Sequence, residues 1–385
     1  MAWSAAARVV EARLDRFAFG LAAREDEAAI RRLLRENAFG RSISLSFERE
    51  PDAFAAATID GDVHQTLVAR DRASGAIVAV AARSVRDVFL NGAPVRAGYL
   101  GQLRIDRSCH GLRGLLNEGF AFCRTLHHAG DARLYLTSIV AEDHAARRLL
   151  LERRFTAAPR FVETGRLVTL AMPVWRPSKN VEIPGVRICR GSPAFIDEIV
   201  ACLRRNLRRY QFAPCWAAGD LLSAGRTRGL ALEDFFVAIG GDRVRGCLAL
   251  WDQRTFKQVV VRGYGPSLAR WRPLVNLAAG WTGIPRLPAV GRALQFAYLS
   301  HAAVDDDRPD VLTALIAAAC RRAHDARLDY VVTAFAARNP LLDAIARRFR
   351  HRELTSILAV AHWPDGHDLA SSLDGRIPQP EVATL

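Results

Sequence analysis

GYLGQLRIDRSCHGLRGLL, from Gly98 to Leu116, joins an apolar strand to a helix through a turn that contains two glycines. The pattern predicts a strand over Gly98–Ile105 and a helix from about Leu115 to His127. Such a turn exposes backbone N–H groups at a helix N-terminus, where the helix dipole adds to their attraction for phosphate. Glycine also lets a ligand approach the backbone closely. The stretch therefore indicates either an anion-binding loop or an ordinary strand-to-helix turn.

The segments on either side of this stretch alternate between strands and helices. Before it, we predict a short helix at residues 3–15, a strand at 17–22, a helix beginning near Arg24, and a hairpin of 66–70 with 77–83. After it come a strand at 134–139, a helix at 145–153 and a strand at 167–173. An antiparallel hairpin followed by alternating helices and strands implies a mixed α/β sheet.

The second half of the chain repeats the first. AGYLGQLRID at 97–106 aligns without gaps over FAYLSHAAVD at 296–305, and both copies are followed by a helix, a strand, a second helix and a strand that ends at a tryptophan. Recurrence in the same order indicates a duplication. The polar, proline-containing stretch 175–185 is the natural linker. We therefore expect an N-terminal domain at 1–178, a second domain at 179–373 and a C-terminal tail at 374–385.

Composition excludes several classes of protein. The chain has 385 residues, seven scattered cysteines without a C-x-x-C pair, and a net charge of +14 that comes almost entirely from arginine. Neither a metal site nor a redox motif is predicted, and no aromatic and basic stripe suggests nucleic acid as a partner. The sequence has neither an apolar run of about 18 residues nor a signal peptide, so we expect a cytoplasmic protein without a membrane partner. The arginine excess suits a polyanionic small ligand.

Two motifs resemble those of the GNAT N-acetyltransferases. The family's strand ending V-x-P, followed by Q/R-x-x-G-x-G/A, is similar to the stretch with Ile105, Arg107, His110 and Gly111, although Arg113 stands where the family's next glycine belongs. The family's N-x-x-A-x-x-L-Y-x-x-x-G-F helix resembles residues 143–155, in which four positions are in register: Asp143, Ala146, Leu149 and Phe155. The resemblance covers residues 17–173 and, more weakly, 186–363.

The resemblance implies two tandem GNAT-like domains, each a mixed, mostly antiparallel sheet flanked by helices. It implies an acyl-CoA-dependent N-acyltransferase that moves an acyl group, expected to be acetyl, from acetyl-CoA to a primary amine of a small molecule or peptide. Leu150 stands where many relatives have a tyrosine that protonates the departing thiolate. A non-catalytic acyl-CoA-binding sensor or scaffold is therefore the alternative.

The resemblance also assigns candidate site residues. Coenzyme A is expected to contact Leu103, Arg104, Ile105, His110, Gly111, Leu112, Arg113, Gly114, Leu115 and Asp143. The catalytic candidates are Glu142, Asp143 and Tyr99, and the acceptor candidates are Phe47, Glu48 and Gln102. Each has a purely structural alternative: a helix cap for Glu142 or Asp143, a core position for Tyr99, and a solvated loop for Phe47 and Glu48.

The second copy departs from the motif at the cofactor loop. Asp305, Asp306 and Asp307 replace the glycine turn, and desolvated carboxylates there would repel a pyrophosphate. Asn339, by contrast, matches the family's asparagine better than Asp143 does. We therefore expect the second domain to keep the fold and to bind no coenzyme A.

The loop can be tested by charge. Gly111→Asp places bulk and a negative charge where a pyrophosphate would lie, so coenzyme A binding should be abolished while the fold is retained. Titration calorimetry checks the affinity, and circular dichroism checks the fold. Unchanged affinity would make the loop a simple turn.

Overall fold

A computed structural model describes residues 16–109, 113–128, 132–153, 155–176, 178, 180–282 and 285–385. The helix expected at 3–15 lies outside these residues. The N-terminal half contains β1 (Phe17–Leu21), α2 (Glu27–Glu36), β2 (Ile43–Glu48), α3 (Ala53–Ala57), β3 (Val63–Asp71), β4 (Ile77–Leu90), β5 (Ala93–Ile105), α4 (Arg113–His128), β6 (Tyr135–Val140), α5 (His144–Arg147) and β7 (Arg160–Pro173).

The C-terminal half repeats this order with one long insertion. It contains β8 (Val186–Arg190), α6 (Ile196–Leu207), β9 (Ala213–Pro214), α7 (Ala218–Leu221), β10 (Phe235–Gly240), β11 (Arg243–Trp251), β12 (Gln258–Tyr264), α8 (Pro266–Thr282), β13 (Phe296–Val304), α9 (Pro309–Asp325), β14 (Tyr330–Ala336), α10 (Pro340–Arg348), β15 (Arg352–His362) and α11 (His367–Ser371). The insertion is β12 with α8, which separates β11 from β13.

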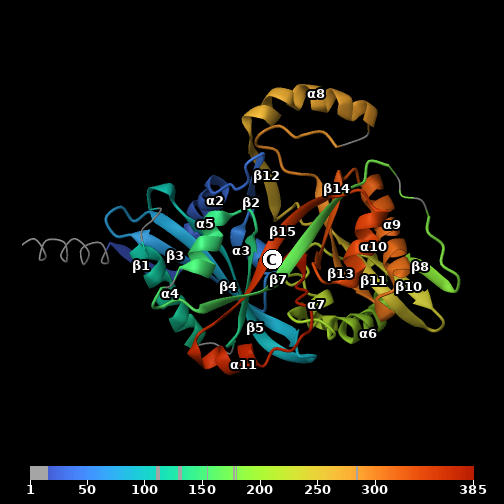
Figure 1. Cartoon of the computed structure of the whole chain (residues 1–385), viewed down its shortest axis with the longest axis horizontal. Helices are drawn as coiled ribbons and strands as arrows, with labels where there is room; N and C mark the ends of the chain where they lie inside the picture. Colours follow the sequence, from blue (N-terminus) through green and yellow to red (C-terminus); the bar gives the residue numbers. More distant parts are fainter. Residues whose placement is uncertain are drawn as a thin grey trace, which may run out of the picture.

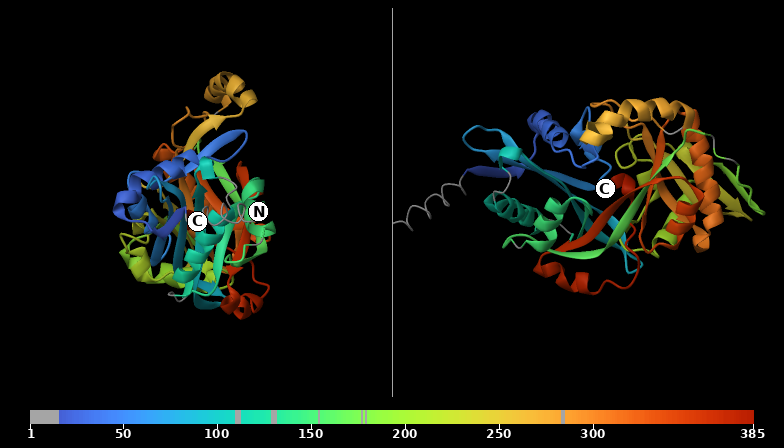
Figure 2. Two further views of the ribbon diagram at one scale, coloured as in Figure 1. Left: turned by 90° about the vertical axis from the view of Figure 1, so that its left-hand side faces the viewer. Right: turned by 45° about the horizontal axis from the view of Figure 1, so that its top comes forward.

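The two halves share one continuous sheet because they exchange their last strands (Figures 1 and 2). In the described part of the chain the strand order is β1-β3-β4-β5-β6-β15-β7-β14-β13-β11-β10-β8. Strand β15, from the C-terminal half, pairs with β6 of the N-terminal half, whereas β7 pairs with β14. The expected class, mixed and mostly antiparallel with flanking helices, is confirmed.

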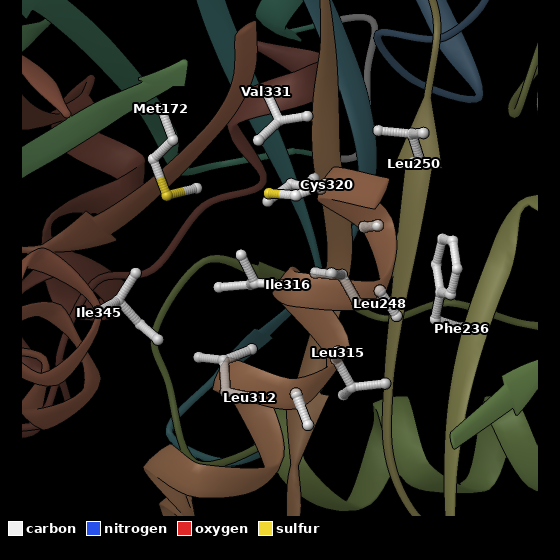
Figure 3. Close-up of a cluster of buried hydrophobic side chains, with 14 of the residues drawn as sticks. Met172, Phe236, Leu248, Leu250, Leu312, Leu315, Ile316, Cys320, Val331 and Ile345 are labelled. Atoms are coloured by element: carbon white, nitrogen blue, oxygen red, sulfur yellow. The ribbon is translucent and has the colours of Figure 1, made fainter. Parts of the chain in front are cut away.

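The core follows the exchange of strands. Figure 3 shows Met172 of β7 among side chains of α9 and of the C-terminal strands, including Ile316 and Val331. On the other side, Leu358 and Val360 of β15 are buried in a cluster with Leu136 of β6. Each half therefore completes its apolar core with a strand from the other half, and separating the halves would expose both cores to water.

A matching irregularity in both halves confirms the duplication. The register of β4 against β5 shifts between Val80 and Ala82, and Gln102 there has a φ of 56°. The register of β11 against β13 shifts between Cys247 and Ala249, and His301 there has a φ of 53°. Such shifts with an extra residue on one strand are β-bulges. Gln102 and His301 are the residues that the gapless alignment pairs.

Several boundaries differ from expectation. Helix α4 begins at Arg113, so Gly114 lies in its first turn and not in the preceding loop. The acceptor candidates Phe47 and Glu48 lie in strand β2, which pairs with β12 of the other half in a separate two-stranded sheet. Propensity did not show this strand because a partner distant in the sequence creates it. No helix among the described residues is long and apolar enough to cross a membrane.

The parallel pairing at Gly98 permits a substitution test. A Cβ on Gly98 would lie 2.1 Å from the ring of Tyr135, so Gly98→Ala should lower the free energy of unfolding by about 2 kcal/mol or more. Gly20→Ala, in strand β1, is the matched control because nothing lies within 4 Å of its added Cβ. Urea denaturation of both variants checks the difference. Equal stability of the two would show that Tyr135 moves aside freely.

Candidate functional site

Strands β5 and β6 part from each other shortly after they meet. They are paired in parallel at Gly98 with Tyr135 and at Tyr99 with Leu136. Beyond these pairs β6 follows β15, with Ser138 opposite Leu358, while β5 stays with β4. The carboxyl ends of β5 and β6 therefore diverge. We call this opening the N-terminal splay.

Tyr99 bridges the N-terminal splay near its narrow end. Its hydroxyl and the Ser138 hydroxyl are hydrogen-bonded at 2.6 Å, which joins β5 to β6 through side chains where their backbones no longer pair. Burial raises the pKa of the Tyr99 hydroxyl, so it stays protonated at neutral pH. The ring folds back over Gly101, where an added Cβ would lie 2.6 Å from it. Tyr99 thus forms a floor across the opening.

Gln102 occupies the bulge beside the opening, and its side chain reaches two buried charges. Arg49 Nη2 donates to Asp60 Oδ2 at 2.7 Å, and both side chains are buried. With its amide oriented to satisfy its neighbours, Gln102 accepts from the same Arg49 guanidinium. Gln102 and Arg49 also line a small hollow with Ala53, Phe54, Thr66 and Ile30. The arrangement couples the bulge to a polar pocket under α2 and α3.

His64 stands in the same row of the sheet as Tyr99. His64 is opposite Ser84, and Ser84 is opposite Tyr99, so the three side chains share one face. The Nδ1 atom of His64 lies 3.4 Å from Asp60 Oδ2, and Nε2 lies 3.1 Å from Thr66 Oγ1. Burial lowers the pKa of His64 below its ordinary 6.5 and the Arg49 charge adds to this, while Asp60 opposes it. His64 is therefore a neutral base at pH 7.

Arg104 lies at the wide end of the N-terminal splay. One guanidinium nitrogen donates to the Leu103 carbonyl at 2.9 Å, and its buried Nε has no hydrogen-bond partner among the described residues. Burial lowers the pKa of Arg104, and the charge of Asp143 across the opening partly offsets this. A half-buried cation with a buried, unused donor fits an anionic ligand. The Arg104 guanidinium therefore suits the negatively charged phosphates of coenzyme A.

The remaining cofactor candidates surround the start of α4. Leu103 and Ile105 end strand β5, and Gly114 is in the first turn of α4. The Leu115 side chain is buried with Phe17 and Cys109, so it anchors α4 to the sheet and only its backbone can face a ligand. His110, Gly111 and Leu112 lie outside the described residues, as does the Arg113 side chain.

Asp143 caps a helix at the carboxyl end of β6. Its carboxylate accepts from Ala146 N at 2.9 Å, whereas Glu142 is exposed in the preceding turn. Asn339 caps α10 in the same way, accepting from Leu341 N at 3.0 Å. The equivalence of Asp143 and Asn339 inferred from the sequence is thus matched by their geometry. The catalytic role of Glu142 and Asp143 stays a prediction.

Phe47 and Glu48 belong to the sheet of β2 and β12. Phe47 stacks on Phe39 with ring centroids 5.0 Å apart. Glu48 is buried, and it accepts from Ser46 and from Arg262 of β12. These partners make Glu48 part of the contact between the two halves. A role in binding the acceptor stays a prediction for both residues.

A buried cluster of charges where the halves meet escaped the sequence analysis. Burial lowers the pKa of Lys257 to about 8 and that of Arg86 to about 10, and it raises the pKa of Glu381. Arg86 donates to Thr384 Oγ1 at 2.5 Å, and Lys257 donates to the Ala383 carbonyl at 3.2 Å. Only Lys257 carried a sequence signal, because it is one of two lysines in the chain.

The tail enters the equivalent opening of the C-terminal half, between β13 and β14, where it lines a cavity of about 50 Å³ with residues of both strands. Gln379 accepts from Ala336 N at 2.8 Å and donates to the Ala334 carbonyl at 2.9 Å, both on β14. Glu381 accepts from His301 N, on the bulge of β13, at 2.8 Å. At the equivalent bulge no described side chain is hydrogen-bonded to Gln102 N. The two openings therefore differ in what enters them.

The acidic turn of the C-terminal half is largely neutralised. Asp305 accepts from Arg205 at 2.8 Å and from Asn206 at 2.8 Å. Asp307 accepts from both terminal nitrogens of Arg209, at 2.8 and 2.9 Å. The carboxylates thus repel an anion less than the sequence suggests, but they occupy the arginines that would bind it. Among the described residues no group of three His, Cys, Asp or Glu side chains could hold a metal ion.

Comparisons with known proteins find similar structures only. No family model matches the sequence, and no curated protein matches it. The structure resembles a GCN5-related glucosamine N-acetyltransferase region of a fungal multi-domain GH3 β-N-acetylglucosaminidase, with a TM-score of 0.59 and 14% identity over 89% of this chain. This chain spans 38% of that one.

Two shorter proteins are covered more fully. N-myristoyltransferase from Saccharomyces cerevisiae with bound myristoyl-CoA has a TM-score of 0.58 and 13% identity, over 90% of this chain and 82% of that one. A GCN5-related N-acetyltransferase from Sphaerobacter thermophilus has a TM-score of 0.56 and 12% identity, over 90% of this chain and 96% of that one. The chain has the GNAT fold that the sequence motifs led us to expect.

Proposed function

We propose that this chain, which has the GNAT fold, is an acyl-CoA-dependent N-acyltransferase with one active site, in the N-terminal splay. Fold alone does not specify activity, so the site residues must support it. The support comes from the opening between β5 and β6, the bulge at Gln102 and Arg104 with its buried, unpartnered Nε. The bulge supplies a backbone N–H donor, the Tyr99 side chain closes the narrow end of the opening, and Arg104 supplies a cation near its wide end.

The observation that carries the proposal is the difference between the two bulges. At the C-terminal bulge, His301 N already donates to a carboxylate, that of Glu381. The bulge geometry there holds a backbone N–H against a side-chain oxygen acceptor within the opening. At Gln102 the same geometry recurs without such a side chain among the described residues. A donor held in this way stabilises the oxyanion that develops when a thioester is attacked, which is typically worth a few kcal/mol.

Coenzyme A would be held by Arg104, by the backbone between Arg107 and Gly114, and by the N-terminus of α4. When bound, it supplies an activated acyl group on a thiol that leaves readily. The hydrogen bond between Tyr99 and Ser138 crosses the opening beside the bulge and limits the depth available to the acyl chain. This favours a short acyl group, and we propose acetyl-CoA as the donor.

The acceptor amine would enter from the side of the hollow beneath α2 and α3, which Arg49 and Thr66 line. Asp60 is buried beside Arg49, and the His64 side chain is 12% exposed beside Asp60. The amine nitrogen attacks the thioester carbonyl, a C–N bond forms, the C–S bond breaks and the sulfur leaves as a thiolate. One proton must leave the amine nitrogen. His64 is neutral and has a ring nitrogen 3.4 Å from Asp60, whose carboxylate would stabilise the imidazolium that forms. We therefore assign proton acceptance to His64.

Turnover tests the proposed function directly. The full chain, incubated with acetyl-CoA and a panel of primary amines and amino-terminal peptides, should release free coenzyme A thiol in an amine-dependent manner. Titration calorimetry should give one coenzyme A site per chain. Binding without release across the panel would establish the sensor alternative, and two equivalent sites would contradict the asymmetry of the openings.

The role of His64 predicts a pH profile. Because its pKa is lowered below 6.5, His64 stays neutral at neutral pH, and kcat should fall only as the pH drops through that lowered pKa. His64→Gln should lower kcat about 10²-fold and remove this acid limb, while the affinity for acetyl-CoA stays unchanged. Steady-state kinetics between pH 5 and 8 (about the range in which histidine titrates) measures both effects.

Three further variants locate the base. His144→Gln changes an exposed histidine at the start of α5 and should retain wild-type turnover. Glu142→Gln and Asp143→Asn test the carboxylates that the sequence favoured, and Asn caps a helix as well as Asp. If kcat falls about 10²-fold in either carboxylate variant while His64→Gln keeps normal turnover, the base lies in the turn after β6.

A further inference from the structure

Helix α8 projects from the body of the protein and exposes its apolar side chains. Figures 1 and 2 show it standing apart from the main sheet, above the sheet of β2 and β12. Trp281 is 87% exposed and Leu277 is 67% exposed, and four further large apolar side chains of this insertion are also exposed: Trp271, Leu274, Val275 and Val290. Exposed apolar residues gathered in this way mark an interaction surface.

The apolar side of α8 faces away from the loop that follows the helix. Two polar residues contact that loop: Asn276 donates to the Leu287 carbonyl at 3.0 Å and accepts from Leu287 N at 2.7 Å. Arg272 donates to the same carbonyl at 3.2 Å. Trp271, Leu274 and Trp281 lie on the opposite, outer side. A helix on the surface of a soluble protein normally buries its apolar side, so α8 is built to present that side to something outside the chain.

The insertion that contains α8 carries charge of one sign. Between Asp252 and Asp305 the sequence contains no acidic residue and seven basic ones. Of these, Arg270, Arg286 and Arg292 are exposed and have no ion pair among the described residues. A surface that combines tryptophan, leucine and unpaired arginine matches the interface of an anionic bilayer, which offers an apolar interior beneath a layer of negative headgroups.

We propose that α8 docks the protein onto an anionic lipid bilayer, with Trp271, Leu274, Leu277 and Trp281 inserted into the interface and the exposed arginines at the headgroups. The helix lies on the membrane surface and does not span it. This departs from the expectation of no membrane partner, which rested on the absence of an apolar run of spanning length. The proposal does not depend on the proposed acyl transfer.

Vesicle binding tests the proposal. The full chain should co-sediment with phosphatidylcholine vesicles that contain phosphatidylglycerol, at least about tenfold more strongly than with phosphatidylcholine alone. Its tryptophan emission should shift to shorter wavelength on binding. The triple variant Leu274→Gln, Leu277→Gln, Trp281→Gln should bind these vesicles at least about tenfold more weakly. In the wild type, the three apolar side chains are transferred from water into the bilayer interface, and glutamine loses that gain.

The controls separate lipid from the other possible occupants of the surface. Leu222→Gln changes an equally exposed leucine next to α7 and should bind vesicles like the wild type. Unfolding temperature shows that the triple variant, altered only at exposed positions, is folded. Absence of vesicle binding by the wild type overturns the proposal. If the wild type does not bind vesicles but forms dimers that the triple variant does not form, the surface is occupied by a second copy of the chain.

Discussion

The antiparallel pairing of β7 with β15 holds the molecule together. It runs from Arg352 opposite Ala171 to His362 opposite Arg160, along the whole length of β15. Because each of these strands ends the sheet of the other half, the two apolar cores share the same backbone ladder. Register in such a ladder is fixed, since a shift by one residue would move Met172 and Leu358 out of their cores. The halves are thus fixed relative to each other.

Strand exchange also explains why each half has an opening. Strands β6 and β14 are drawn toward β15 and β7, so their parallel contact with β5 and β13 is confined to a few residues. The bulges at Gln102 and His301 then direct backbone groups into the gaps. Duplication produced two such gaps, and the tail enters one of them, where Glu381 accepts from the bulge N–H of His301. We infer that the other gap, whose bulge N–H has no such side-chain partner among the described residues, carries the chemistry.

Burial of charge requires both halves and the tail at once. Arg86 and Lys257 come from different halves, and both bond to the last residues of the chain. Removal of the tail would take away the hydrogen-bond acceptors of these two cations. Because a buried cation without partners is strongly destabilising, the free energy of unfolding would fall. The same low-polarity environment lowers the pKa of His64 and makes it a base at neutral pH. The electrostatics of the site therefore depend on tertiary assembly.

Local pattern and the tertiary fold determined different features. The sequence alone predicted most strands of the N-terminal half, the duplication and the equivalence of Asp143 with Asn339, because periodicity, turn residues and helix caps act over a few residues. It did not predict the exchange of β7 and β15, the pairing of β2 with β12, the entry of Glu381 into the second opening or the pairing of His64 with Asp60. Those features join residues that the sequence separates or leaves without a local signature, so only the packed fold, through burial and backbone pairing, brings them together.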